Sequence, residues 1–325
     1  MIAKTNFISP EFFWRRVHSF TGFWLVLYLL LHLITNSQAG LWIGDDGHGF
    51  IQMVNKLESL PYLQVVEFLL IGMPIVIHGA WGIKRAMEAR FNQGKNRGDK
   101  PSLSYERNYA FAWQRLTSWI LLIGIIGHVV QMRFLDAPKK VLTSRGEAYF
   151  VKISFDEGLY TLTNRLHVAL FTPQELTQVR EELRARGAIE TPPLEKSATF
   201  EPDQQMARVL LQEAKEEINW MGTLTSYHLK SNELVAVSGT PGTAYLLMVR
   251  NTFKNPVMAI LYTIFLLATV FHAGNGLWTF LITWGALLSF RSQKAMIPLS
   301  ILGMLFLSTL GLAAIWCSYW VNLRY

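Results

Sequence analysis

Cysteine is almost absent from this chain of 325 residues, since Cys317 is the only one. A single thiol excludes an internal disulfide, an iron–sulfur cluster held by this chain alone and the Cys-x-x-Cys-His motif that attaches haem covalently. We interpret Cys317 as a packing residue. Any cluster must therefore belong to a partner, and any haem must be bound without covalent attachment.

Charged residues are also scarce, at 16% of the chain, whereas hydrophobic residues make up 51%. Typical soluble proteins carry about 25% charged residues. Five long apolar runs explain the difference, at about 19–36, 62–83, 114–134, 257–284 and 297–320. Each run can cross a hydrocarbon core of roughly 30 Å as a helix. The first could also be read as a signal peptide cleaved near Ala39-Gly40, but it is longer than the usual apolar region of roughly 7–15 residues.

The charges are distributed unevenly around these runs. The connection between the second and third runs is strongly basic, with Glu88, Asp99 and Glu106 set against Lys84, Arg85, Arg90, Lys95, Arg97, Lys100, Arg107 and Arg115. Lys4, Arg15, Arg16, Arg291 and Lys294 flank the same side, and the first connection is acidic. The positive-inside rule then places the N-terminus in the cytoplasm and the C-terminus outside. Because the basic residues flank membrane spans, nucleic-acid binding is a poor explanation for them. The sequence predicts a multi-pass protein of a bacterial inner membrane.

The long segment between the third and fourth runs divides the chain into residues 1–134, 135–254 and 255–325. The middle segment has nearly balanced charge and is expected outside the membrane. A helix is predicted from Thr172, an N-cap with Glu175 three residues later, to Gly187. A second helix ends at Gly222, and two short strands are expected around Gly-Thr-Pro-Gly at 239–242. The expected fold class is an all-α membrane protein of five helices with a small mixed α+β insertion.

Four of the eight histidines lie deep inside the apolar runs, namely His32, His78, His128 and His272. An ionisable side chain inside a membrane is costly, and it is a functional hypothesis by default. The other histidines of the extra-membrane segments, His48, His167 and His228, occur singly without a catalytic spacing. We expect surface or structural roles for them.

The depths of the four membrane histidines match in pairs. With a rise of 1.5 Å per residue, His32 and His128 lie about 21 and 22 Å from the inner ends of their helices. His78 and His272 lie about 25 and 22 Å from the outer ends of theirs. His32 can therefore face His128 near the outer surface, and His78 can face His272 near the inner surface. The two levels are about 15 Å apart.

Glycines accompany three of these histidines: Gly79 and Gly82, Gly124 and Gly127, and Gly274 and Gly276. Small residues beside an imidazole leave room for a flat macrocycle, although they also permit close packing of helices. His32 has no adjacent glycine. Two facing imidazoles at each of two depths are what two b-type haems require, so we predict haem ligation by these four residues.

Several polar residues lie at the inner boundary of the membrane. His18, in Arg-Arg-Val-His-Ser, could contact a haem propionate or a quinone, or be a plain interfacial residue. Arg15, Arg16, Arg85 and Arg115 could pair with propionates, and contact with phospholipid headgroups explains each of them equally well.

Four sequence motifs together resemble one protein family. These are RRVHS in the first run, MPIVIHGAWGI in the second, WQRLTSWILLIGIIGHV in the third, and FHAGNGLWTFLITWG followed by RSQ. They are similar to the five-helix, di-haem cytochrome b subunits that anchor succinate dehydrogenase and fumarate reductase, the succinate:quinone oxidoreductases. The resemblance covers some 200 residues of the membrane part and not the 135–254 insertion, where that family usually has a short loop.

The resemblance implies bis-histidine ligation of an inner haem by His78 and His272, and of an outer haem by His32 and His128. It also implies a flavoprotein subunit, which holds the dicarboxylate site that this chain lacks, and an iron–sulfur subunit, both docked on the cytoplasmic face. The electron acceptor would be a quinone, often menaquinone in this class, bound near the outer haem. Some fumarate reductases of the family carry a membrane glutamate two residues before the fourth-helix ligand. Val270 occupies that position here, which favours the succinate-oxidising members.

Two other interpretations are consistent with the residues. One is a di-haem cytochrome b of another respiratory enzyme, such as a hydrogenase or a formate dehydrogenase. The other is a haem-free transporter whose buried histidines relay protons.

Overall fold

The computed structural model describes residues 9–88, 106–144, 146–188 and 201–325. Five of the predicted cytoplasmic basic residues and one acidic residue lie outside this part of the chain: Lys4, Arg90, Lys95, Arg97, Lys100 and Asp99. The chain forms two compact units. The first comprises Met1–Ser37, Ser59–Val130 and Pro256–Ile315, and the second comprises Gln38–Glu58, Gln131–Asn255 and Trp316–Tyr325.

Among the described residues, five helices are long and apolar enough to span a membrane, as the sequence predicted. Two of them are the regular helices α1 (Pro10–Leu41) and α10 (Pro256–Thr283). A third consists of α3 (Leu63–Glu67) and α4 (Met73–Glu88), joined by the π-helical turn Phe68–Gly72. The other two are α5 (Glu106–Val129), extended by π-helical Val130–Leu135, and α11 (Phe290–Leu312), extended by π-helical Ala313–Asn322. Large apolar side chains on them remain exposed, such as Val76 and Ile123. Lipid tails are the environment in which such surfaces are stable.

A proline sets one contact between α1 and α4. Pro74 has no N–H, so the carbonyl of Leu70, four residues earlier, loses its usual helical partner. The indole N–H of Trp24 on α1 donates to this carbonyl at 2.6 Å. The hydrogen bond fixes α1 against the helix that carries His78.

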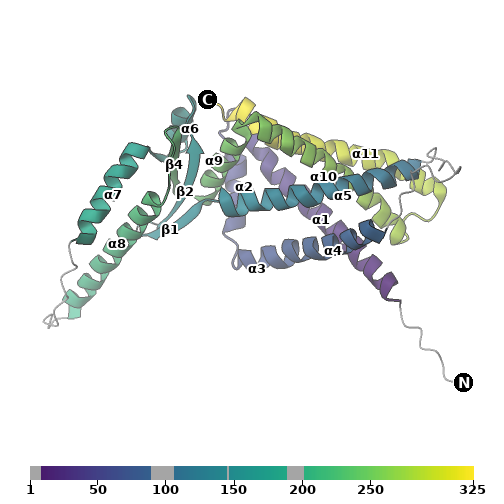
Figure 1. Cartoon of the computed structure of the whole chain (residues 1–325), viewed down its shortest axis with the longest axis horizontal. Coiled ribbons are helices and arrows are strands. Elements are labelled where there is room, and N and C mark those ends of the chain that lie inside the picture. Colours follow the sequence, from purple (N-terminus) through teal and green to yellow (C-terminus); the bar gives the residue numbers. More distant parts are fainter. Residues whose placement is uncertain (1–8, 89–105, 145, 189–200) are drawn as a thin grey trace, which may run out of the picture. The chain divides into compact units, whose positions relative to one another are not determined.

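Small residues let α10 pack closely on α11, and α10 also contacts α5 (Figure 1). A side chain at Gly311 would collide with Leu266, and one at Gly274 would collide with Met304. Close approach through small residues is the usual way in which membrane helices associate. The helix that carries His272 is therefore held by two neighbours.

The second unit is built around a four-stranded antiparallel sheet in the order β1-β2-β4-β3. The strands are β1 (Lys139–Thr143), β2 (Gly146–Ser154), β3 (Ala169–Phe171) and β4 (Glu233–Ser238), and the helices are α2 (His48–Glu58), α6 (Leu159–Arg165), α7 (Pro173–Ala188), α8 (Glu201–Thr225) and α9 (Pro241–Lys254). Figure 1 shows α7 and α8 side by side. Their apolar residues and one sheet face form a core of Val141, Phe150, Leu176, Leu224 and Val235. α9 contacts both β2 and α2. The mixed α+β character predicted for the insertion is thus confirmed.

The helix expected from Thr172 is confirmed together with its capping box. The backbone N–H of Glu175 donates to the Thr172 hydroxyl at 3.2 Å, and the Thr172 N–H donates to the Glu175 carboxylate at 2.7 Å. The second predicted helix is also present, but it continues past Gly222 to Thr225.

The second of the two predicted strands is wrong. After β4 the chain enters α9, so Gly-Thr-Pro-Gly begins a helix instead of a hairpin turn. Thr240 is the N-cap and accepts from the N–H of Thr243 at 3.4 Å, while Pro241 occupies the first turn, where its missing N–H does no harm. Nearly every residue of α9 from Gly242 to Phe253 is buried, so tertiary burial outweighs the strand propensity of its apolar residues.

One buried ion pair ties the C-terminal residues to the rest of the second unit. Arg250 is 1% exposed and donates to both carboxylate oxygens of Asp156, at 2.7 and 2.6 Å. Its Nε donates to the carbonyl of Leu323 at 2.7 Å, and Lys254 lies 3.1 Å from Asp156. Burial alone would raise the pKa of Asp156, but the hydrogen bonds and charges of Arg250 and Lys254 together outweigh burial and hold this pKa below its ordinary value.

Candidate functional site

The four membrane histidines come together in two pairs within the first unit. The ring centres of His32 on α1 and His128 on α5 are 5.8 Å apart, with an angle of 85° between the rings. The ring centres of His78 on α4 and His272 on α10 are 6.3 Å apart, at 77°. These are the partners that helix depth predicted. Four different helices each supply one imidazole.

These distances fit two imidazoles on opposite sides of one metal ion. A bond between a metal and an imidazole nitrogen is about 2 Å long, which puts two such ring centres roughly 6 Å apart. Direct stacking would bring the rings much closer, as between His18 and His78, whose centres are 4.0 Å apart at 12°. In the described part of the chain no group of three or more His, Cys, Asp or Glu side chains could hold a metal ion. Each pair offers two imidazole donors.

Hydrogen bonds orient the inner pair. The carbonyl of His18 lies 3.1 Å from Nδ1 of His78, so Nδ1 must carry the hydrogen and donate it. Nε2 of His78 then has a free lone pair, the form in which histidine binds a metal. Gly22 makes room for this ring, because a Cβ there would lie 2.8 Å from Cε1 of His78.

The other histidine of the inner pair, His272, is held through its backbone. Gln114 on α5 donates from Nε2 to the carbonyl of His272 at 3.2 Å, and it accepts from the amide of Asn275 at 2.8 Å. Nδ1 of His272 is buried and lacks a hydrogen-bond partner among the described residues.

The outer pair has side-chain partners. Nδ1 of His128 lies 3.3 Å from the hydroxyl of Tyr262 on α10. Nδ1 of His32 lies 3.5 Å from the amide nitrogen of Asn36, at the upper limit of hydrogen bonding, and Tyr28 packs on its ring. Of the two rings in the outer pair, His32 thus has the longer contact at Nδ1.

The glycines beside the histidines divide into two kinds. At Gly79 and Gly127, each next to a histidine, an added Cβ would meet no atom within 4 Å, so space is open there for a bound group. Gly124 and Gly274 are in contact with Phe265 and Met304 and serve helix packing instead. The glycines next to His78 and His128 are thus not used for close helix packing.

The boundary residues take different partners. His18 stacks on His78, and its own Nδ1 is buried without a partner among the described residues. Arg85 pairs with Glu11 at 2.6 Å and with Glu88 at 3.0 Å. Arg16 lies over the rings of Phe12 and Trp284, and Arg115 lies near the ring of Phe111. Arg15 is exposed.

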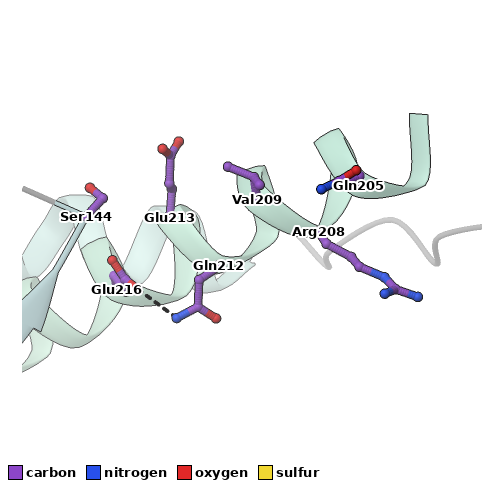
Figure 2. A pocket seen from close by; sticks show the side chains of 7 residues that line it. All are labelled: Ser144, Gln205, Arg208, Val209, Gln212, Glu213 and Glu216. Atoms are coloured by element: carbon purple, nitrogen blue, oxygen red, sulfur yellow. Dashed lines mark hydrogen bonds between the residues drawn. The ribbon is translucent and has the colours of Figure 1, made fainter. Parts of the chain in front are cut away.

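The remaining histidines lie in the second unit and in none of these pairs. His48 contacts the carbonyl of Asp45, and His167 occupies a left-handed turn with φ of 55°. A shallow hollow in the same unit is lined by Ser144 and one face of α8 (Figure 2). Its Gln212 and Glu216 bond to each other at 2.7 Å, and the lining offers no set of groups for catalysis.

Sequence reasoning missed Tyr262, Gln114 and Asn275. Asn275 lies three residues after His272 on α10, a helical spacing that could have indicated it. The partners of Asn275 and Tyr262, Gln114 and His128, are on α5, so only the packing of α10 against α5 brings these side chains together.

Comparison with known proteins gives an informative match. The chain is 22% identical over 308 residues to the succinate dehydrogenase cytochrome b558 subunit of Bacillus subtilis (strain 168), with 94% of this chain and 96% of that protein covered. No family model and no solved structure matches. The match spans nearly the whole of both proteins, and the five membrane-capable helices fit the resemblance that the motifs indicated. The chain is therefore similar, over nearly its whole length, to a cytochrome b subunit of succinate dehydrogenase.

Proposed function

We propose that this chain anchors a succinate dehydrogenase complex in the membrane and conducts electrons from an iron–sulfur subunit to a quinone. It would act as one subunit of an oxidoreductase, with the dicarboxylate site on the flavoprotein subunit. The observation that carries the proposal is the pair of facing imidazoles at each of two positions. The named relative, a cytochrome b, supports the same function.

Two b haems are the cofactors that these pairs fit. When bound, haem supplies a one-electron carrier whose potential depends on its axial ligands, burial and hydrogen bonding. His78 and His272 would hold the inner group, and His32 and His128 the outer one. Donation from Nδ1 to a carbonyl keeps Nε2 of His78 available as a ligand, and the Tyr262 hydroxyl can accept from Nδ1 of His128 in the same way.

The acceptor is proposed to be menaquinone, at an outer site near His32 and His128. Val270 supports succinate oxidation as the direction, because it is an apolar residue, 2% exposed, where some fumarate reductases of the family have a membrane glutamate. No carboxylate is present there to carry protons.

The partners are proposed to be a flavoprotein and an iron–sulfur subunit on the cytoplasmic face. The basic residues around the second connection give this face a positive charge, which favours docking of an acidic surface. His18, Arg15 and Arg115 remain candidates for contacts with propionates, quinone or lipid at the same boundary.

The haem content of the purified chain tests the proposal directly. A pyridine haemochrome assay should give two non-covalent haems b per chain. A chain without haem would support the proton-coupled transporter and overturn our proposal.

The identity of the complex is tested by purifying the tagged chain from its native membrane under mild conditions. A co-purifying subunit with covalent flavin and succinate:quinone reductase activity is expected. A nickel or molybdenum subunit in its place would assign the chain to a hydrogenase or a formate dehydrogenase.

A further inference from the structure

The imidazoles of the two pairs differ in what their second nitrogen contacts. In the inner pair, Nδ1 of His78 donates to a backbone carbonyl, which no side-chain substitution removes. In the outer pair, Nδ1 of His128 lies 3.3 Å from the phenol oxygen of Tyr262. The hydroxyl of Thr21 also approaches a paired imidazole, but it is 3.5 Å from Nδ1 of His78. Of these two contacts among the described residues, the one with Tyr262 is shorter and better placed for hydrogen bonding.

The position of Tyr262 is firmly set. Its ring packs edge-on against His128, with centres 5.8 Å apart at 73°, and against Phe265 at 6.3 Å. Phe265 in turn fills the space beside Gly124, one turn before His128. The phenol is thus held between α10 and α5 with its hydroxyl at the imidazole edge.

Ligation through Nε2 fixes the direction of the hydrogen bond. A neutral imidazole that uses Nε2 as a ligand carries its hydrogen on Nδ1 and donates it to the Tyr262 oxygen. An acceptor at this position makes the imidazole a more basic ligand and fixes its rotation. A more basic ligand stabilises ferric over ferrous iron and lowers the reduction potential.

We propose that Tyr262 is a positioning residue for His128, and that its hydroxyl lowers the potential of the outer haem relative to the inner one. This inference rests on the proposed haem ligation. It adds a role for a residue of α10, so that one helix supplies a ligand to the inner centre and a hydrogen-bond acceptor to the outer centre.

The test is Tyr262→Phe in the intact complex, with redox titration of the haem absorption bands. We expect both haems to be retained, the potential of one component to rise, and that of the other to stay unchanged. A tenfold loss of preference for the ferric form corresponds to about 59 mV for a one-electron couple. The low-temperature electron paramagnetic resonance signal of the same component should move, because it depends on the angle between the imidazole planes.

Two controls define the result. Thr309→Val removes a hydroxyl that is exposed on α11 and bonds to its own helix, so it should change neither potential. His128→Ala identifies the outer component by its loss.

If Tyr262→Phe does not assemble, 3-fluorotyrosine at position 262 keeps the volume, weakens the acceptor and should shift the same component in the same direction.

The outcomes separate the inference from the proposed function. Unchanged potentials in a variant that retains two haems would overturn the role of Tyr262, as would a shift confined to the inner component. Absence of haem from the wild-type chain would instead overturn the proposed function itself.

Discussion

Each paired histidine belongs to a different helix, so the four proposed ligands can be removed one at a time. We predict that His78→Ala or His272→Ala removes the inner haem, and that His32→Ala or His128→Ala removes the outer one. The physical reason is that two rings about 6 Å apart would share one iron in the proposed centre, and a single imidazole would bind it weakly. Haem content and the redox spectrum of each variant measure this.

His48→Ala is the matched control for these substitutions, because His48 is exposed in the second unit and should retain both haems. Equal loss of both haems from all four variants would contradict the pairing.

Arg250 illustrates the cost of removing half of a buried ion pair. Arg250→Met leaves Asp156 without its bidentate partner and frees the carbonyl of Leu323. Breaking a buried pair in this way costs about 3–5 kcal/mol. Thermal unfolding of the detergent-solubilised protein should show this loss of stability, measured as limited proteolysis of the second unit. The double variant with Asp156→Leu should recover part of it, and an unchanged unfolding temperature in Arg250→Met would refute the role of the pair.

The same pair sets a pH dependence. The pKa of Asp156 in the folded chain is lowered, so this carboxylate contributes stability above its unfolded pKa of about 3.9 and loses it as the pH falls through the lower, folded value. The hydrogen bond with Arg165 also lowers the pKa of Asp46, so the stability that Asp46 contributes is lost as the pH falls in the same way. We expect proteolytic resistance of the second unit to be constant from about pH 6 to 8 and to fall below about pH 4. A loss that begins near neutral pH would point to other groups.

At the scale of helices, an amide bridge between α5 and α10 holds the backbone of His272, a proposed haem ligand. Asn275 is 7% exposed, and its amide donates to Gln114, which in turn donates to the carbonyl of His272. Asn275→Leu leaves the Gln114 oxygen without its donor in a buried site, at about 1–3 kcal/mol. We predict weaker retention of the inner haem on heating, with the outer haem retained. Asn275→Asp is not a suitable control because it adds a charge, whereas Thr309→Val on the lipid side should have no effect.

The missing backbone N–H of Pro74 also helps to position two helices. Pro74 cannot donate to Leu70, and the carbonyl that becomes available accepts from Trp24. The π-helical turn Phe68–Gly72 lies at the same place, where the regular hydrogen-bonding ladder is interrupted. The interruption thus becomes a contact between α1 and α4, the two helices that carry His18 and His78.

At the scale of the whole molecule, the charge distribution predicts the sidedness of the chain. A variant with Cys317→Ser carries no cysteine, so single cysteines can then be placed on either side. Thr177→Cys on exposed α7 should react with a membrane-impermeant maleimide in intact spheroplasts. Lys294→Cys, near the start of α11, should react only after the membrane is opened. The reverse pattern would show that the N-terminus is outside.

The sequence by itself determined the five spans and the pairing of the histidines, because hydropathy and helical rise act along one chain and need no knowledge of its neighbours. It also determined the helix from Thr172, whose capping box is local. The helical state of residues 241–254 and the contacts of Tyr262, Gln114 and Arg250 were decided by the tertiary structure. Each depends on a partner far away in the sequence, and burial against that partner outweighs the local propensity that a sequence pattern reports.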